Sequence, residues 1–414
     1  MSWEYDRPAG RPKNKLLLIV AAILVLGVVG TGYWAWNRHN NKIARSPTSS
    51  SNQKSTQVST KPQFSSVSGR YLFNGTVTWA RAVERGARLA NGTYDYSKPF
   101  SQLNTFQREL YEGWSTDFEC PITDNTVPYQ TQIDNLIFNC RPEFLPEATK
   151  YFNLFDLANN HTDNQNGMVG LTKTRQYLDK AGVQYFGSFD PSVSDDVCEV
   201  VALPVRLQKA DKTEEKANLP VAFCAWHYFY RKPLAGEIEV MQKYAQIMPV
   251  FAFVEMGAEY HPSADAIQQE IAHKVVDLGP EFLLANNPHW VQNTEVYKGK
   301  LIVYSMGNFI FDQLNAETNR SASIDATITV PYDDNVAKWL ALAPKCASFH
   351  DDCLNQAQLR GLTKYKLQLK YGVVAGQGGN NQITHKADAA TQTAVEQRLN
   401  WSQTCAQLGY NSCQ

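Results

Sequence analysis

The chain has 414 residues, 43% hydrophobic and 12% aromatic, a composition that excludes a disordered chain, a collagen-like chain and a small disulfide-rich knot. The formal net charge is −1, but residues 1–62 hold nine Lys and Arg against two acidic residues, so the remainder carries a net charge of −8. A body this acidic has no general attraction for nucleic acid, which we exclude as a partner.

The N-terminal region predicts a membrane anchor. After a short cytoplasmic tail, residues 1–15, the segment Leu16–Trp36 contains no charged residue and is long enough to cross roughly 30 Å of hydrocarbon as a helix. The alternative is a cleaved signal peptide, but the bulky TGYWAW end lacks the small residues of a cleavage site. We therefore predict a single-pass membrane protein with an uncleaved signal anchor at 16–36.

Residues 37–68 are rich in Ser, Thr, Asn and Gln and predict a solvated linker. The body, 69–414, alternates short apolar runs with helical patterns, which predicts an α/β layered core. Predicted strands are 71–78, 152–158, 221–226, 250–254, 282–285, 301–305 and 323–330, and predicted helices are 170–181, 238–245 and 264–278. Residues 336–358 are predicted to be an insertion, followed by a strand over 365–374, a hairpin turn at GQGGNN and a helix over 389–401.

All eight cysteines follow the apolar segment, and none shows the close spacing of a zinc ribbon. An even count and a membrane anchor favour disulfides in an oxidising compartment, so we predict that the body lies on the extracytoplasmic side. The alternative is a set of unpaired buried thiols. Neighbours in sequence give the pairs Cys120–Cys140, Cys198–Cys224, Cys346–Cys353 and Cys405–Cys413, although spacing leaves the actual pairing open.

Polar loops follow several predicted strands. They contain residues 159–163, 255–262 and 286–289, and a fourth polar stretch covers 117–119. Amide oxygens, imidazoles and carboxylates that converge from several loops are what a divalent metal site requires. The alternative is that His161 and His289 only hydrogen-bond to loop backbone. His227 is predicted to be structural and His273 to face solvent.

The sequence resembles a known family at these loops. LANNHTDNQNGMVGLTKTRQYLDKAGVQYFG (157–187) and EVYKGKLIVYSMGNFIFDQ (295–313) are similar to motifs of bacterial capsule-synthesis proteins of the CapA/PgsA type, which are linked to poly-γ-glutamate capsules, and GAEYHP and NPHWVQ align between them. The resemblance runs from about Arg70 to about Val330. It implies a four-layer α/β/β/α sandwich similar to metal-dependent phosphoesterases.

This sequence departs from the family's pattern at several ligand positions. Thr76 stands where the family has an Asp, Glu255 replaces the His of an HWG motif, and Asn287 replaces the first His of an HPH motif. Asp163 comes one residue early, and Asn164 takes the family's Asp position. Losing imidazoles while retaining oxygen donors shifts a site away from Zn²⁺ and toward Mn²⁺, Mg²⁺ or Ca²⁺.

The resemblance implies roles for individual residues. His161 is predicted to act as a general acid oriented by Asp163. The remaining predictions fall into two groups. The predicted metal ligands are Glu119, Asn160, Glu255, Asn287 and His289, with the alternative that no metal is bound, and the predicted substrate-binding residues are Glu259, Tyr260 and Asn308.

The predicted function is that of a membrane-anchored CapA-like protein that handles an envelope polymer during capsule or surface-polymer production, with weakened or lost hydrolytic activity. The net charge of −8 opposes uniform binding of a polyanion unless a basic cleft or a bridging cation intervenes, so no polymer is named. One alternative is an active metal-dependent hydrolase acting on a phosphoester or an amide-type bond. Another is a scaffold for membrane-bound synthesis partners.

Overall fold

The computed structural model describes residues 64–189, 197–229, 231–346, 350–379 and 382–414, which belong to one compact unit. No helix within these ranges combines the length and apolar character needed to cross a bilayer. The predicted tail at 1–15, the predicted anchor at 16–36 and residues 37–63 of the predicted linker lie outside the described residues.

Strand β1 (Phe64–Val77) is the strand on which the sheet is built. It begins seven residues before the predicted strand start at Tyr71, so the predicted linker is wrong for residues 64–68. These Ser-containing residues pair antiparallel with β5 (Cys198–Lys209) and β12 (Arg320–Pro331), which satisfies their backbone groups. The C-terminal part of β1 instead pairs in parallel with β2 (Gly113–Phe118) and β11 (Asn308–Ile310).

Two arms of the sheet therefore share β1. The long arm has the order β14-β13-β12-β1-β5-β6-β7-β8-β10-β9, and the short arm runs from β1 through β2 and β3 to β4. The remaining long-arm strands are β6 (Glu214–His227), β7 (Val250–Glu255), β8 (Phe282–Asn286), β9 (Thr294–Tyr297), β10 (Lys300–Val303), β13 (Gln368–Gln377) and β14 (His385–Lys386). β3 (Leu154–Asp156) and β4 (Gln184–Phe186) complete the short arm. The predicted hairpin after β13 is confirmed by its antiparallel pairing with β14.

Aromatic side chains fill the space between the two arms. The ring of Phe73 on β1 lies 6.2 Å from that of Phe251 and 5.4 Å from that of Phe282, on β7 and β8. The ring of Phe186 on β4 lies 4.9 Å from that of Phe253. Contacts of this kind place the short arm against the long arm through a dry core.

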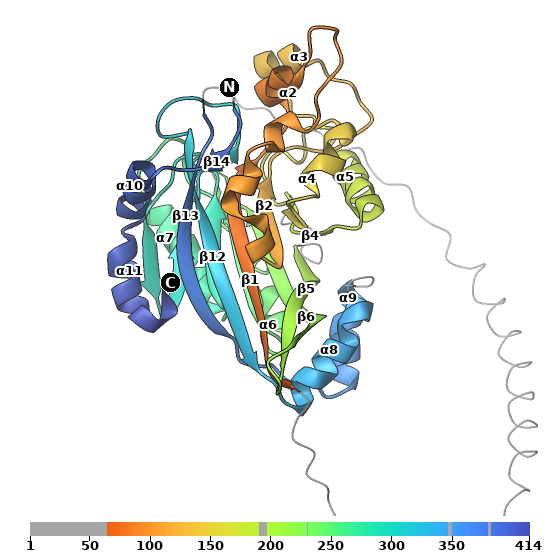
Figure 1. Cartoon of the computed structure of the whole chain (residues 1–414), viewed down its shortest axis with the longest axis vertical. Helices are drawn as coiled ribbons and strands as arrows, with labels where there is room; N and C mark the ends of the chain where they lie inside the picture. Colours follow the sequence, from red (N-terminus) through yellow and green to blue (C-terminus); the bar gives the residue numbers. More distant parts are fainter. Residues whose placement is uncertain (1–63, 190–196, 230, 347–349, 380–381) are drawn as a thin grey trace, which may run out of the picture. The chain divides into compact units, whose positions relative to one another are not determined.

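Helices cover the outer faces of both arms (Figure 1). α5 (Met168–Ala181) buries Leu171 and Leu178 in a second apolar cluster beside β2 and β3. The other helices are α2 (Arg81–Ala87), α3 (Tyr129–Asn135), α4 (Leu145–Ala148), α6 (Met241–Ala245), α7 (Ala266–Asp277), α10 (Ala389–Leu399) and α11 (Trp401–Leu408). The predicted mixed α/β architecture is confirmed.

The predicted insertion at 336–358 forms two helices, α8 (Asp334–Cys346) and α9 (His350–Leu359). α8 contacts β6 and α9 contacts β5, so this pair covers the β5–β6 hairpin. Trp339 of α8 is fully buried, and its indole N–H donates to the carbonyl of Thr363. The segment thus contributes to the main core.

All eight cysteines lie in described residues and form four disulfides, which are the predicted pairs. Cys198 and Cys224 lie directly opposite each other on β5 and β6. The other three close loops of 7 to 20 residues in sequence separation. The alternative of unpaired thiols is therefore wrong.

Candidate functional site

Polar side chains from both arms meet at the carboxyl ends of the parallel strands. Asp117 lies on β2, Asp156 ends β3 and Glu255 ends β7. Asn159, in the loop after β3, joins the two arms because its amide donates to Asp117 and to Glu255. Loops at this edge of a layered α/β fold commonly carry functional residues, as the sequence pattern predicts.

A chain of hydrogen bonds lies at the centre of the site. Thr76 Oγ1 donates to Asp117 Oδ2 at 2.7 Å, and Asn159 Nδ2 donates to Asp117 Oδ1 and Glu255 Oε1, each at 3.1 Å. All four residues are buried. Thr76 therefore donates a hydrogen bond to the carboxylate of Asp117, whereas the resembling family has an Asp at the position of Thr76.

Burial shifts the titration of these carboxyl groups. It raises the pKa of Asp117 to about 6, against the opposing hydrogen bonds from Thr76 and Asn159. Burial also raises the pKa of Glu119 to about 8, although the nearby charge of His289 opposes the shift. At neutral pH Glu119 therefore retains its proton unless a cation replaces it, whereas Asp117 is mostly ionised.

Asp156 and Glu255 share this behaviour. Burial raises the pKa of both groups well above the ordinary value, and the charge of Asp117 adds to the shift in each case. Asp156 accepts a hydrogen bond from the backbone N–H of Ala158 at 2.9 Å. Four buried carboxyl groups, those of Asp117, Glu119, Asp156 and Glu255, are thus collected at one edge of the sheet.

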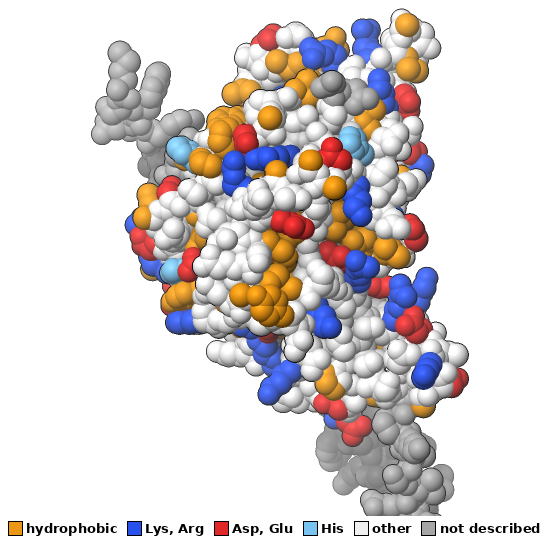
Figure 2. Space-filling view, turned by 60° about the vertical axis from the view of Figure 1, so that its left-hand side comes forward, with side chains coloured by type: hydrophobic (Ala, Val, Ile, Leu, Met, Phe, Trp, Pro, Cys, Tyr) orange, Lys and Arg blue, Asp and Glu red, His pale blue; other side chains and the backbone are white. Residues whose placement is uncertain are grey.

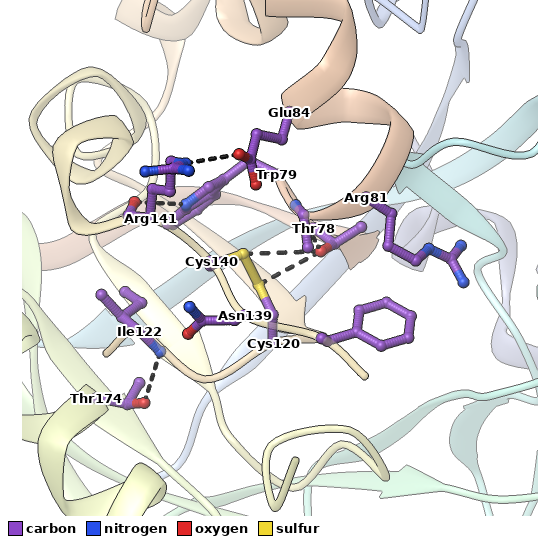
Figure 3. The surroundings of a disulfide bond; sticks show 12 residues. Thr78, Trp79, Arg81, Glu84, Cys120, Ile122, Asn139, Cys140, Arg141 and Thr174 are labelled. Carbon is purple, nitrogen blue, oxygen red and sulfur yellow. Dashed lines mark hydrogen bonds and ion pairs between the residues drawn. A yellow bond between two sulfur atoms is a disulfide. The ribbon is translucent and has the colours of Figure 1, made fainter. Parts of the chain in front are cut away.

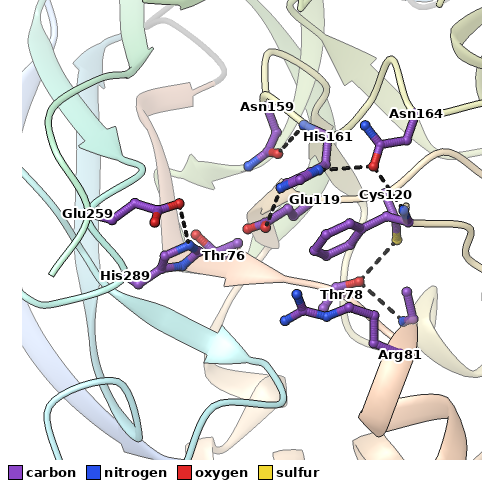
Figure 4. Close-up of polar contacts among 12 residues, drawn as sticks. Thr76, Thr78, Arg81, Glu119, Cys120, Asn159, His161, Asn164, Glu259 and His289 are labelled. Carbon is purple, nitrogen blue, oxygen red and sulfur yellow. Dashed lines mark hydrogen bonds and ion pairs between the residues drawn. The ribbon is translucent and has the colours of Figure 1, made fainter. Parts of the chain in front are cut away.

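His161 lies beside this cluster with a defined tautomer (Figure 4). Its Nδ1 is 3.0 Å from Asn164 Oδ1, and the same oxygen accepts the backbone N–H of Phe138 at 2.8 Å. An amide oxygen only accepts, so Nδ1 carries the proton and Nε2 presents its lone pair. Nε2 lies 3.8 Å from Glu119 Oε1, and burial lowers the pKa of His161 to about 4.

The prediction that Asp163 orients His161 is wrong in its residue. Asp163 is exposed, and it accepts a hydrogen bond from the Asn164 amide at 2.8 Å. Asn164 therefore stands between the two, and Asp163 acts on His161 only through it. The sequence indicated that Asn164 could contact His161, because Asn164 occupies the position of the family's Asp.

The structure also moves the predicted asparagine ligand by one residue. Asn159 is fully buried and holds the central network, whereas Asn160 is half-buried. Among the described residues, no hydrogen bond joins the Asn160 side chain to the carboxyl cluster. A turn at 159–162, where the backbone N–H of Thr162 donates to the carbonyl of Asn159, directs the first of the two amides inward.

The predicted residues His289, Glu259, Tyr260 and Asn308 are brought together. His289 Nδ1 lies 2.8 Å from Asn308 Oδ1, and its Nε2 lies 3.7 Å from Glu259 Oε1. The ring of Tyr260 stacks on His289 with centroids 5.7 Å apart. Burial alone lowers the pKa of His289, but Glu259 and its other partners raise it above its ordinary value.

Asn287 lies on the loop after β8 with a positive φ of 100°, a conformation that Asn tolerates better than most residues. Its amide nitrogen donates to the carbonyl of Gly257. This bond ties the loop after β8 to the loop after β7. Its amide group thereby has a structural role at the edge of the site.

A disulfide fixes the wall of the site (Figure 3). Cys120 directly follows Glu119, and its bond to Cys140 ties that strand end to the loop that carries Phe138. Thr78 Oγ1 donates to Cys120 Sγ at 3.3 Å. The ring of Phe138 in turn stacks on His161 with centroids 4.0 Å apart.

The chemistry of the donors suits an oxygen-preferring divalent cation, and Glu119 Oε2 is buried without a hydrogen-bond partner. Their placement does not suit one. No group of three or more His, Cys, Asp or Glu in the described ranges is arranged to hold a metal ion. Asp117 and Glu255 accept hydrogen bonds from Thr76 and Asn159, and these donors compete with a metal ion for the carboxylate oxygens.

Several residues of the site were not predicted from the sequence. Asp156, Asn159 and Asn164 are the main ones, and Asp117 was noted only as part of the Asp-Phe-Glu stretch. Their position in the sequence could have identified them, because each is a polar residue at or just after the end of a buried strand or within the loop that follows it.

A sequence model of the family described as bacterial capsule synthesis protein PGA_cap matches residues 70–313. The chain is 34% identical over 87 residues to the PGA biosynthesis protein CapA of Bacillus subtilis (strain 168), covering 21% of this chain and 22% of the relative. It is 38% identical over 68 residues to the capsule biosynthesis protein CapA of Bacillus anthracis, covering 16% of each. Each alignment thus spans less than a quarter of the relative's length.

Two solved structures were also compared. The calcineurin-like phosphoesterase YfkN from Bacillus subtilis aligns over 83% of this chain and 99% of its own, with 11% identity and a TM-score of 0.40. TT1561 of Thermus thermophilus aligns over 62% and 93%, with 7% identity and a TM-score of 0.33. The family match covers more than half of the chain, so this protein belongs to the bacterial capsule synthesis protein PGA_cap family.

Proposed function

We propose that this protein is a membrane-tethered, extracytoplasmic PGA_cap protein that binds or handles an envelope polymer in capsule or surface-polymer production, with weakened or lost hydrolytic activity. The observation that carries the second part is the bond from Thr76 to Asp117. A hydroxyl donor in place of a carboxylate removes one ligand and occupies another. Protons rather than a metal then neutralise the buried carboxyl groups.

The compartment follows from the cysteines. Four disulfides fit an oxidising environment outside the cytosol. The tether is proposed from the apolar segment at 16–36 alone, which is long enough to span a bilayer. In this proposal the two arms and their helices correspond to the α/β/β/α layers of a metallophosphoesterase.

Metal content tests the loss of the metal centre. The full-length protein, solubilised in detergent and purified without chelator or nickel, is soaked in Mn²⁺, desalted and measured by elemental mass spectrometry. We expect no stoichiometric metal in the wild type. The matched variant Thr76→Asp combined with Glu255→His restores two ligand types, and we expect it to retain metal. Asn287 is left unchanged because its positive φ penalises His.

One outcome would overturn the proposal. If the wild type retains about one or two metal equivalents and Glu119→Ala empties the site, the metal centre is intact. A second candidate function, an active metal-dependent hydrolase, would then be favoured. The unprotonated Nε2 of His161, 3.8 Å from Glu119, is the observation that supports this candidate, but it is placed to accept a proton and not to donate one as the predicted general acid would. Its test is hydrolysis of model phosphoesters and peptides that chelator abolishes and Mn²⁺ restores.

A further inference from the structure

Arg81 lies between the two histidines of the site. The carbon of its guanidinium is 4.4 Å from the ring centroid of Phe138 and 5.2 Å from that of Phe311. Phe138 stacks on His161, and the ring of Phe311 is 5.0 Å from that of His289. A cation thus lies at the middle of a series of rings that ends in a histidine on each side.

The backbone of Arg81 is in the left-handed region, with φ of 52°. For an L-residue other than Gly this costs about 1 kcal/mol, and such outliers gather at functional sites. Asp312 holds the conformation, because it accepts from Arg81 Nη2 and from the backbone N–H of Ala82. The strain places the guanidinium at the site instead of in solvent.

Part of the guanidinium is left without a partner. Only 10% of the Arg81 side chain is exposed, yet its Nε is buried with no hydrogen-bond acceptor. Glu119 Oε2, on the same side of the site, is likewise buried without a partner. Unsatisfied buried polar atoms are costly, so these two atoms need partners that water or a ligand supplies.

The charge of Arg81 acts within the site. Burial raises the pKa of Glu119, and the guanidinium works against that shift; burial lowers the pKa of His161, and the guanidinium adds to that shift. On the face shown in Figure 2, Lys and Arg are interspersed with Asp and Glu and form no continuous basic patch. Recognition of an anion by this acidic body must therefore be local.

We propose that Arg81 binds an oxyanion group of the ligand, a phosphate or a carboxylate, beside the partly exposed side chains of His161 and Glu259. The side chains there are partly accessible, with 21% of His161 and 31% of Glu259 exposed. A guanidinium presents a planar fork of donors that matches such groups. The inference rests on the proposed function, in which ligand recognition persists without a bound metal.

The test is calorimetric titration of the full-length protein in detergent, with inorganic phosphate in one arm and glutarate in the other, with and without EDTA. We expect saturable binding of at least one anion that EDTA does not change. Arg81→Gln should weaken it about ten-fold or more, the loss expected for a hydrogen bond to a charged group. Arg81→Lys should weaken it less, because Lys keeps the charge without the fork.

Two control variants separate binding from structure. Arg141 also pairs with a carboxylate, that of Glu84 at 2.6 Å, and lies 5.0 Å from the Tyr94 ring, but outside the site. Arg141→Gln should leave anion affinity unchanged. Asp312→Asn keeps an oxygen acceptor that can hold Arg81 in place but removes the competing negative charge, so it should preserve or tighten binding. Melting curves establish whether each variant folds. If Arg81→Gln does not fold, Arg81→Lys and Asp312→Asn still test the inference.

Three results would overturn the inference alone. The first is that neither anion shows saturable binding. The second is that Arg81→Gln binds with the same affinity as the wild type. The third is that Asp312→Asn loses binding as Arg81→Gln does, which would make Arg81 a structural residue. Binding that EDTA abolishes and Mn²⁺ restores would overturn both this inference and the proposed function. The other three results leave the proposed function standing.

Discussion

Thr76 Oγ1 donates a hydrogen bond to Asp117 Oδ2 at 2.7 Å, between two strands that run in parallel through the middle of the site. The hydroxyl thus occupies a carboxylate oxygen that would otherwise be open to a cation. Because Thr76 and Asp117 are both buried, the bond also replaces solvation that Asp117 has lost. In the proposed function, the same bond also weakens the site for a metal ion.

Thr76→Val should destabilise the protein more at about pH 8 than at about pH 5. Asp117 has a pKa of about 6, so its carboxylate is ionised at the higher pH and the lost bond is the stronger, charge-assisted kind. The expected costs are about 2 kcal/mol and about 1 kcal/mol respectively. Denaturant unfolding at both pH values measures them.

Thr116→Val is the matched control for that experiment. Thr116 is also buried, on β2, but its hydroxyl donates to the backbone carbonyl of Gly75 at 3.2 Å. A bond to a neutral carbonyl does not change with the ionisation of Asp117, so the cost of this variant should be the same at both pH values. Equal pH dependence in Thr76→Val and Thr116→Val would contradict the assigned role of the Thr76 bond.

Glu119→Gln should flatten the dependence of stability on pH. The pKa of Glu119 is raised from 4.5 to about 8 in the folded protein, so the folded state holds a proton that the unfolded state has lost. This stabilisation is complete below pH 4.5 and is lost as pH rises toward 8, at up to about 1.4 kcal/mol per pH unit. Gln mimics the protonated form and removes the slope.

The range from pH 6.5 to about 8 separates the effect of Glu119 from those of His161 and Asp117. Below pH 6.5, His161 contributes in the opposite sense, because its lowered pKa of about 4 costs stability as pH falls from 6.5. Asp117, with a pKa of about 6, contributes below the chosen range. Unfolding free energies of wild type and variant in that range provide the check. A slope that persists in Glu119→Gln would assign it to the other raised groups, such as Glu255.

The sequence predicted β7 and β8 closely. β7 and β8 are continuous apolar runs, and their predicted ranges agree with the observed ones to within one residue. β5 was missed because Pro204 and Arg206 interrupt its pattern, although Pro204 pairs opposite Asn218 within the β5–β6 hairpin. β2 was missed because its buried polar residues belong to the site and do not follow an apolar pattern.

The site could be located from the sequence but not resolved to single residues. Glu119, His161, Glu255 and His289 were predicted from motif spacing, and the structure brings them to one edge. In the loop after β3 the prediction and the structure differ by one residue at two places. Asn159 takes the place predicted for Asn160, and Asn164 takes the place predicted for Asp163. Turn geometry decides which side chain of adjacent polar residues points inward, and spacing does not specify it.

Asn164→Asp should raise the pKa of His161 from about 4 toward its ordinary value. A carboxylate at this position accepts the Nδ1 proton with a full negative charge, which favours the imidazolium. Titration of the histidine ring resonances by NMR measures the shift. Asp163→Asn is the control, and it should move the His161 pKa only slightly. A larger shift in Asp163→Asn than in Asn164→Asp would restore the direct role first predicted for Asp163.

Removing the Cys120–Cys140 disulfide by double substitution to Ala should destabilise the protein by about 3 kcal/mol, from the chain entropy of a loop of this length. The bond spans 20 residues, whereas Cys346–Cys353 spans 7, so the same change there should cost about 1 kcal/mol less. Only the first bond adjoins Glu119 and the Phe138 loop. We therefore expect its removal to weaken anion binding in the calorimetric assay, while removal of Cys346–Cys353 leaves binding unchanged. Equal losses of anion binding in the two variants would show that the Cys120–Cys140 bond supports the site only through global stability.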